Sequence, residues 1–330
     1  MMYEIMDSRG MAAQASNLSF RDKERLCEQH FEMCRTRYGE FWHICTPGYL
    51  SEILFTDEED FRFAISNAAI SAAESGVMVI TDCTMTNHIH SLAAGTVQQC
   101  RNYLDVYRYR LSKYLDKRGK YISLKGFTCD SPIPVPTLDA VRNEIVYINR
   151  NGYVVNSAYT PFSYPWGSGY LYFNPLAREP RGIPYQNAAF TEKRRLSMRR
   201  VADMPSSYRY HRGMILPESY VRYDFGEKMF RDAHHYLNLL TRNVEAYSEE
   251  AKRLSDTIVL SDEEIYPAAR MLSEKRCGVK QPSLLPVEQK IEIARAMIRD
   301  YHASGAQVRR IFKLPDELHA QLFPTVSSRF

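Results

Sequence analysis

Hydrophobic residues recur with two different periods along the first half of this 330-residue chain. Short apolar runs at residues 41–46 and 77–92 predict buried strands. Apolar residues at steps of three and four predict helices at residues 20–38, 56–76, 97–118 and 137–151. The second strand therefore follows a strand and a helix, and it leads into a second long helix.

The helix between the two strands has recognisable ends. Thr56 is followed three residues later by Glu59, which is the spacing of a capping box. Gly76 stands where a left-handed residue commonly ends a helix. The helix is therefore expected to run from Thr56 to Gly76 and to lead directly into the second strand.

The second half of the chain is less regular. Proline and glycine at residues 174–184 predict a linker, so a domain boundary is expected near residue 175. We expect a lead-in and helix at 1–40, one domain at 41–174, a basic linker or arm at 175–225 and a helical region at 226–330. Residues 227–254 predict one long amphipathic helix, and residues 287–323 predict three short helices that resemble a helix-turn-helix unit.

Composition narrows the class of protein. Apolar residues make up 45% of the chain and charged residues 25%, which is ordinary for a globular protein. The seven cysteines form no Cys-x-x-Cys pair, which argues against a disulfide framework and a zinc ribbon and favours a reducing compartment. No apolar run approaches the roughly 18 residues of a membrane span. We therefore expect a soluble, cytoplasmic protein without a membrane partner.

Basic and aromatic residues cluster although the net charge is only +4. Tyrosines are interleaved with cations on the helix at 97–118, and a second basic segment covers residues 193–212. The candidate cations are Arg101, Arg108, Arg110, Lys113, Lys117, Lys193, Arg194, Arg195, Arg199 and Arg200. Rings stack on bases and cations bind phosphates, so both segments are candidates for single-stranded nucleic acid. The alternative is an ordinary solvated surface.

Two histidines stand near the end of the second predicted strand. His88 and His90 are two residues apart, so their side chains share one face of a strand while Ile89 points to the other. Two imidazoles on one face form half of a metal site. The alternative is a pair of histidines that only form hydrogen bonds.

The helix at 137–151 carries a second group of polar residues. Its apolar ridge consists of Leu138, Val141, Ile145 and Ile148. At about 100° per residue, Tyr147 lies away from this ridge and shares its face with Asn143 and Asn151. Core packing is therefore not expected for Tyr147, which leaves either an exposed aromatic residue without a role or a tyrosine presented to a partner.

Between residues 41 and 168, five segments in sequence order resemble the HUH tyrosine transposases, and most closely their REP-associated branch. The segments are Phe41-Trp42-His43-Ile44, Phe55-Thr56-Asp57-Glu58-Glu59-Asp60, Met85-Thr86-Asn87-His88-Ile89-His90, Tyr147-Ile148-Asn149-Arg150-Asn151 and Tyr164-Pro165-Trp166. Two positions depart from the family pattern. Thr86 replaces a proline, and Ser91 replaces an apolar residue.

The resemblance implies an α+β fold with a ferredoxin-like or palm-like antiparallel sheet and packed helices at 41–174, followed by a mainly helical C-terminal region. It implies nicking and rejoining of single-stranded DNA hairpins through a 5′-phosphotyrosine bond, as in DNA transposition. Tyr147 would be the nucleophile. His88, His90 and Asn151 would hold Mg²⁺ or Mn²⁺, and the protein would act as a monomer or homodimer.

Two other functions fit the same residues. A domesticated relative could bind DNA hairpins although its catalytic site is inactive. A His-x-His oxygenase of the cupin type would need a carboxylate and a further histidine on neighbouring strands. The next histidine downstream, His211, lies beyond the expected domain boundary.

Overall fold

The computed structural model describes residues 18–46, 53–125, 127–128, 131–155, 159–179, 181–197, 204–241, 262–301, 303, 305–315 and 318. The chain forms two compact units. The first comprises Met1–Arg150 and Pro161–Thr241, and the second comprises Asn151–Thr160 and Arg242–Phe330. Residues 175–225, expected as a linker, therefore belong to the same unit as the first domain, and the later division falls after Thr241.

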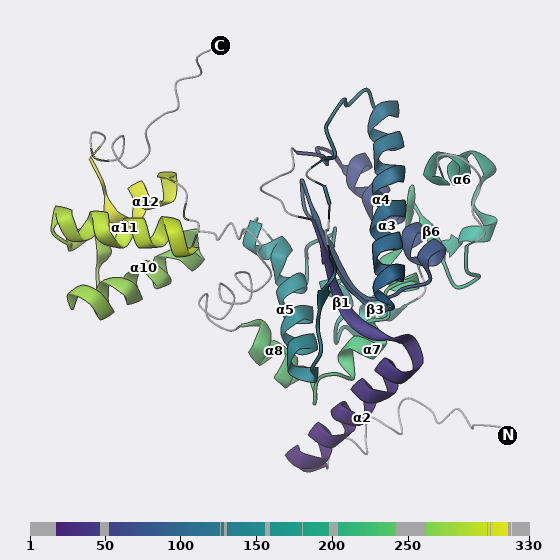
Figure 1. Ribbon diagram of the computed structural model, residues 1–330, viewed down its shortest axis with the longest axis horizontal. Coiled ribbons are helices and arrows are strands. Elements are labelled where there is room, and N and C mark those ends of the chain that lie inside the picture. The colour runs from purple at the N-terminus through teal and green to yellow at the C-terminus, as the bar shows by residue number, and fades with distance from the viewer. Residues whose placement is uncertain are drawn as a thin grey trace. The chain divides into compact units, whose positions relative to one another are not determined.

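The main sheet of the first unit has four strands in the order β2-β3-β1-β4, and all neighbours are antiparallel (Figure 1). The elements that build it are β1 (Glu40–Cys45), α3 (Glu58–Ser75), β2 (Met78–Thr84), β3 (Ile89–Gly95), α4 (Val97–Lys117) and β4 (Ile133–Pro134). This order of elements with this order of strands is the ferredoxin-like arrangement. The α+β fold with an antiparallel sheet is therefore confirmed.

The strand predicted at residues 77–92 is in fact a hairpin of β2 and β3. Thr84 pairs with Ile89 across the turn, and the Met85 N–H donates to the His88 carbonyl oxygen at 2.9 Å. Met85 is itself buried. The single apolar residue of the turn is therefore part of the core, and the prediction of one continuous strand is wrong.

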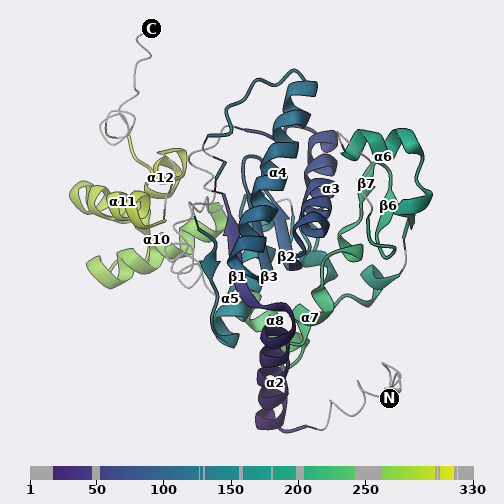
Figure 2. The ribbon, with the colours of Figure 1, turned by 45° about the vertical axis from the view of Figure 1, so that its right-hand side comes forward.

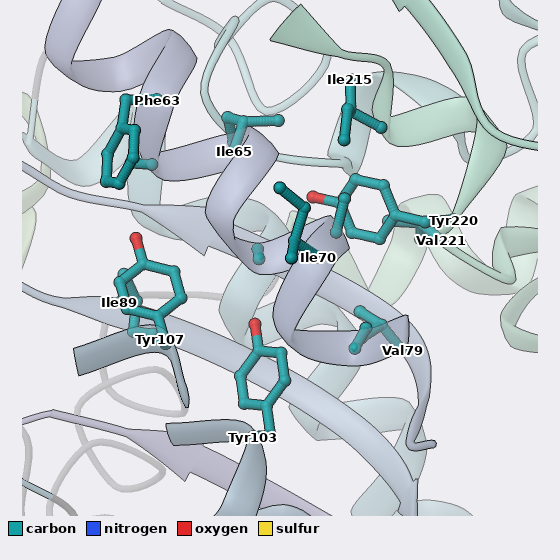
Figure 3. Close-up of a cluster of buried hydrophobic side chains, with 14 of the residues drawn as sticks. Phe63, Ile65, Ile70, Val79, Ile89, Tyr103, Tyr107, Ile215, Tyr220 and Val221 are labelled. Atoms are coloured by element: carbon teal, nitrogen blue, oxygen red, sulfur yellow. The ribbon is translucent and has the colours of Figure 1, made fainter. Parts of the chain in front are cut away.

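Helices α3 and α4 lie side by side on one face of this sheet (Figures 1 and 2). Strand alternation directs Ile44, Ile89 and Ala93 to this face, where they join a buried cluster with Tyr103 and Tyr107 of α4. Figure 3 shows part of the cluster, including side chains from both helices and from β2 and β3. The face that carries Ile89 is therefore the apolar core.

The N-terminus of α3 differs from the prediction by one residue. The side chain of Asp57, not of Thr56, accepts a hydrogen bond from the Asp60 N–H at 2.9 Å. Thr56 instead donates its N–H and hydroxyl to the Asp60 carboxylate. Gly76 ends the helix in the left-handed conformation, with φ of 73°, as predicted.

Helix α5 (Leu138–Val155) contacts the opposite face of the sheet through its residues up to Arg150. The Thr81 hydroxyl of β2 donates to Asn149 Oδ1 at 2.5 Å, and Asn149 Nδ2 donates to the Tyr236 hydroxyl at 3.1 Å. Arg142 Nε donates to the Met229 carbonyl oxygen at 2.6 Å. The part of α5 that belongs to the first unit is therefore bonded both to the sheet and to residues 229–240.

The long helix predicted at 227–254 is interrupted. Helix α7 (Tyr223–Glu227) ends at the residue where the long helix was expected to begin. A separate helix, α8 (Ala233–Leu240), begins after Asp232, whose side chain accepts a hydrogen bond from the His235 N–H at 3.0 Å. Residues 242–254 lie outside the described part of the chain.

The segment with Tyr164 and Trp166 covers the free edge of β2. The Thr84 N–H donates to the Trp166 carbonyl oxygen at 2.8 Å, and the Tyr164 hydroxyl donates to the Thr84 carbonyl oxygen at 2.8 Å. The Ser168 N–H donates to the Asp82 carbonyl oxygen at 2.9 Å. These bonds satisfy backbone groups that an edge strand would otherwise leave exposed.

A second, three-stranded sheet packs on α3 (Figure 2). It consists of β5 (Ile183–Pro184), β6 (Arg209–His211) and β7 (Met214–Ile215), and α2 (Phe20–Tyr38) and α6 (Phe190–Ser197) complete the first unit. The Ile215 N–H donates to the Ser66 hydroxyl of α3 at 3.0 Å, and the Tyr208 hydroxyl donates to the Ala69 carbonyl oxygen at 3.2 Å. The segment expected as a linker is thus folded against the core.

The second unit is helical in its described part, which confirms the predicted helical C-terminal region. It contains α10 (Asp262–Cys277), α11 (Val287–Tyr301) and α12 (Gly305–Phe312), which pack on one another. Helices α11 and α12 correspond to the first two of the three helices predicted at 287–323, and residues 319–323 lie outside the described part. None of the helices described has the length and apolar character required to cross a membrane.

Candidate metal centre

Two neighbouring strands bring nitrogen and sulfur donors together on the face covered by α5. His90 of β3 lies directly opposite Cys45 of β1, and His43 precedes Cys45 by two residues, so the three side chains share a face. Their ligand atoms all lie within 4.8 Å of one another. This group could hold a metal ion.

The two imidazoles are spaced as ligands of one ion would be. His43 Nε2 lies 3.1 Å from His90 Nδ1, and the rings are stacked with centroids 5.3 Å apart. Two nitrogens bound tetrahedrally to one zinc ion at about 2.0–2.1 Å would lie about 3.3 Å apart. A hydrogen bond between the rings fits the same distance. The distance between the two nitrogens is therefore compatible with a shared ion and with a hydrogen bond.

The carboxylate of Glu144 on α5 lies at the other nitrogen of His43. Its Oε1 is 3.1 Å from His43 Nδ1, and both side chains are 0% exposed. This contact favours a proton on Nδ1 and leaves the Nε2 lone pair directed toward His90. Metal-binding histidines commonly donate their second N–H to a carboxylate in this way, which fixes the ring. Glu144 is therefore a positioning residue for His43.

His88 lies beside His90, as the i, i+2 spacing predicts. The two rings meet edge-on, with centroids 4.9 Å apart and an interplanar angle of 82°. His88 Nδ1 is 2.7 Å from Asn87 Oδ1, which favours a proton on Nδ1 and a lone pair on Nε2. His88 is half-buried, and it is not a member of the three-residue donor group.

Tyr147 reaches the histidines from α5. Its ring lies edge-on to His90 at 5.8 Å and to His43 at 6.3 Å, measured between centroids. The side chain is 2% exposed, so the prediction that Tyr147 lies on an outward polar face is wrong. The sheet face under α5 carries His43, His90 and Thr81, and the Tyr147 ring packs on the two histidines. A polar helix face is consequently buried here.

Asn151 follows Tyr147 by one turn on the same helix and is buried. The two compact units divide between Arg150 and Asn151. The first unit by itself therefore supplies the histidines and the tyrosine but not this amide, and the role of Asn151 as a ligand stays a prediction.

The basic helix α4 lies across the sheet from His90, because it packs on the face that carries Ile89. Arg101, Lys113 and Lys117 are exposed, and Arg108 is half-buried. Arg110 differs from these cations and is only 6% exposed. Its Nε donates to Asn67 Oδ1 at 2.7 Å, and its Nη2 donates to the Leu196 carbonyl oxygen. Arg110 therefore links α3, α4 and α6, which corrects its assignment to DNA binding.

The second basic segment is described only in part. Arg194 and Arg195 of α6 are exposed, and Arg195 pairs with Glu59. Lys193 is half-buried and donates to the Gln186 carbonyl oxygen. The predicted contacts Arg199 and Arg200 lie outside the described residues.

Sequence reasoning missed three residues of the centre: His43, Cys45 and Glu144. A signal was present, because His43 and Cys45 have the same i, i+2 spacing on a strand as the two histidines of the hairpin. The register that places Cys45 opposite His90 depends on the pairing of β1 with β3. The periodicity of either strand alone does not contain this information.

No family model, curated protein or solved structure matches the chain. The chemistry of the centre is therefore inferred from its own residues.

Proposed function

We propose that this protein nicks and rejoins single-stranded DNA through a covalent bond between Tyr147 and a 5′-phosphate, in a metal-dependent reaction of the kind that moves DNA. The observation that carries the proposal is the contact of the Tyr147 ring with His90 and His43. Cleavage of a phosphodiester by tyrosine needs a phenol beside groups that can bind a Lewis acid. The Tyr147 phenol and the two histidines lie together between the sheet and α5.

Tyr147 would act as the nucleophile. Its hydroxyl gives up a proton, its oxygen forms a bond to phosphorus, and the bond from phosphorus to the 3′-oxygen breaks. The 3′-oxygen takes a proton and leaves as a hydroxyl. A phenol has a reference pKa of about 10 and loses its proton more readily than an aliphatic alcohol. Attack by another 3′-hydroxyl reverses these bond changes and rejoins the DNA without ATP.

When bound beside Tyr147, a divalent ion would supply Lewis-acid activation of a phosphate oxygen. Two donor sets share His90. The set with His88 and the Asn151 amide oxygen suits Mg²⁺ or Mn²⁺, which is the ion we propose for catalysis. The set with His43 and the thiol of Cys45 suits a softer ion such as Zn²⁺. The metal preference of the protein therefore reports which set is used.

The burial of Tyr147 favours a second candidate function, a protein that binds DNA hairpins without cutting them. At 2% exposure, the phenol reaches a phosphate only after the layers around it separate. Catalysis therefore requires that DNA binds the opened state more tightly than the closed state. A binding protein with an idle site has no such requirement.

The geometry argues against a His-x-His oxygenase. Such a site places two histidines and a carboxylate on one ion. The carboxylate that reaches this centre, Glu144, contacts the Nδ1 side of His43, whereas the Nε2 side faces His90. The third donor of the described group is the thiol of Cys45.

The test is adduct formation by the full chain. The substrates are synthetic single-stranded DNA hairpins, offered with Mg²⁺ or Mn²⁺. Tyr147→Phe should abolish the covalent protein–DNA band on a denaturing gel and leave hairpin binding nearly unchanged. Tyr103→Phe is the matched control, because Tyr103 is equally buried but belongs to the opposite face of the sheet.

Two outcomes would contradict the proposal. An adduct formed by the Tyr147→Phe protein would assign the nucleophile elsewhere. Tight hairpin binding by the wild-type protein without any adduct, at every metal tried, would support the non-catalytic candidate instead.

A further inference from the structure

A pocket of about 560 Å³ lies beside the segment that covers the edge of β2. Its walls come from this segment, from the first turns of α3 and from the β6–β7 hairpin. Pockets of roughly 300–1,000 Å³ hold small organic groups such as a nucleotide. All of the lining residues belong to the first compact unit, and neither Tyr147 nor His90 is among them.

Aromatic rings form part of the wall. Trp166 stacks on Phe61 with centroids 5.0 Å apart and an interplanar angle of 15°, which fixes the indole. Tyr170 donates its hydroxyl to Glu218 at 2.9 Å, which fixes the phenol. Phe162 is 39% exposed. Rings that are already held lose little conformational freedom when a flat ligand stacks on them.

The pocket is also positively charged. Arg62, Arg181 and Arg212 line it together with one carboxylate, Glu58, and Arg181 pairs with Glu218 at 2.8 Å, so the excess positive charge of one unit is at Arg212. Arg62 pairs with Glu58 at 3.1 Å. The guanidinium of Arg181 lies 5.8 Å from the centroid of the Tyr170 ring, so one cation stands beside one of the rings. A ligand that fits these walls carries both a flat ring and a negative charge.

A nucleotide with an unpaired base has both properties. Stacking on a protein ring requires a base that is free of its own partners, and arginines bind the adjoining phosphate. A duplex keeps its bases stacked on one another and does not offer this surface. The pocket therefore fits single-stranded DNA better than double-stranded DNA.

The wall of the pocket is attached to the strand that leads to the candidate metal centre. Thr84 of β2 bonds to the Trp166 carbonyl oxygen, and the next residue, Met85, bonds to the His88 carbonyl oxygen. The position of Trp166 is thus linked to the histidine turn through consecutive backbone groups. A nucleotide bound in the pocket would be held by the same hairpin that presents His88.

We propose that this pocket binds one unpaired nucleotide of single-stranded DNA, with the base against Phe162 and Trp166 and the phosphate at Arg181 and Arg212. The assignment of DNA as the ligand rests on the proposed function. The pocket takes no part in bond breaking, and it serves to hold the strand.

The experiment uses the fluorescence of Trp166. The chain has two tryptophans, so Trp42→Phe leaves Trp166 as the only one. The full-length Trp42→Phe protein is titrated with oligo-dT of about ten nucleotides, a length within the range that one single-strand-binding fold covers. We expect saturable quenching of Trp166.

Two further substitutions probe the walls in this background. Phe162→Ala should weaken the affinity for oligo-dT by about 5- to 150-fold, the equivalent of losing one stacked base. Arg212→Gln should weaken it and reduce the slope of log affinity against log salt by about one. Tyr121→Ala and Arg25→Gln are the matched controls, because both residues are exposed and lie outside the pocket, and they should bind as the parent does.

The outcomes separate this inference from the proposed function. Unchanged affinity in both wall variants, or no saturable quenching, overturns the pocket assignment even if Tyr147 forms an adduct. Equal quenching by dTMP and by oligo-dT would assign the pocket to free nucleotides and overturn its role in strand binding. Normal quenching without any adduct supports the pocket and overturns only the catalytic proposal.

Discussion

Glu144 is expected to raise the metal affinity of the centre although it is not a ligand. The substitution Glu144→Gln keeps the size of the side chain and an oxygen that can accept the His43 N–H, but it removes the negative charge. His43 then becomes a weaker electron donor at Nε2, and its ring is held less firmly. Metal affinity should fall.

The size of the effect follows from the contact. Loss of an outer partner of a metal-binding histidine commonly costs about 10- to 100-fold in affinity, or about 1.4–2.7 kcal/mol. Here the two atoms are 3.1 Å apart and both side chains are 0% exposed, so water does not compensate for the lost charge. We therefore expect a loss near the upper end, about 100-fold.

The assay is competition for Zn²⁺ and Mn²⁺ between the metal-free full-length protein and a coloured chelator. Glu32→Gln is the matched control, because Glu32 is an exposed acid on α2. Thermal unfolding of each variant without metal shows whether the fold is retained.

Unchanged affinity in Glu144→Gln would refute the role of the carboxylate. If His43→Ala and Cys45→Ser also bound metal as the wild type does, the three-donor group would not be the site. The set of His88, His90 and Asn151 would then remain as the alternative.

Three further predictions concern stability and DNA binding. Burial raises the pKa of Asp82 to about 6 from its ordinary value of 3.8, so the folded state holds this proton more tightly. Below about pH 4, Asp82 therefore contributes about 3 kcal/mol to the free energy of unfolding. This contribution is lost as the pH rises through about 6. Asp82→Asn should remove this loss in urea unfolding at pH 4 and 7, and an unchanged pH dependence would contradict the assignment. Arg110→Met should cost about 2–4 kcal/mol of stability because buried acceptors lose their donor. Lys113→Met should leave stability nearly unchanged, weaken DNA binding and reduce the slope of log affinity against log salt by about one. Gly169→Ala should destabilise the protein by about 1–3 kcal/mol, since a Cβ there would lie 2.7 Å from the Pro161 carbonyl oxygen, and wild-type thermal stability of this variant would disprove the close contact.

Local signals in the sequence determined much of the architecture. Helix α4 and the C-terminus of α3 lie where apolar spacing and Gly76 predict them. Alternation along a strand correctly placed His90 and Ile89 on opposite faces. These features depend on residues a few positions apart, so a single chain segment contains the information.

The tertiary structure decided the composition of the candidate centre. Cys45 lies opposite His90 only because β1 pairs with β3 in one particular register, and Glu144 reaches His43 only because α5 crosses that face. The burial of Tyr147 has the same origin, since its ring packs on histidines of two different strands, His43 and His90. Contacts between segments so distant in sequence arise when layers pack, and the periodicity of a single segment cannot encode which partner will cover it.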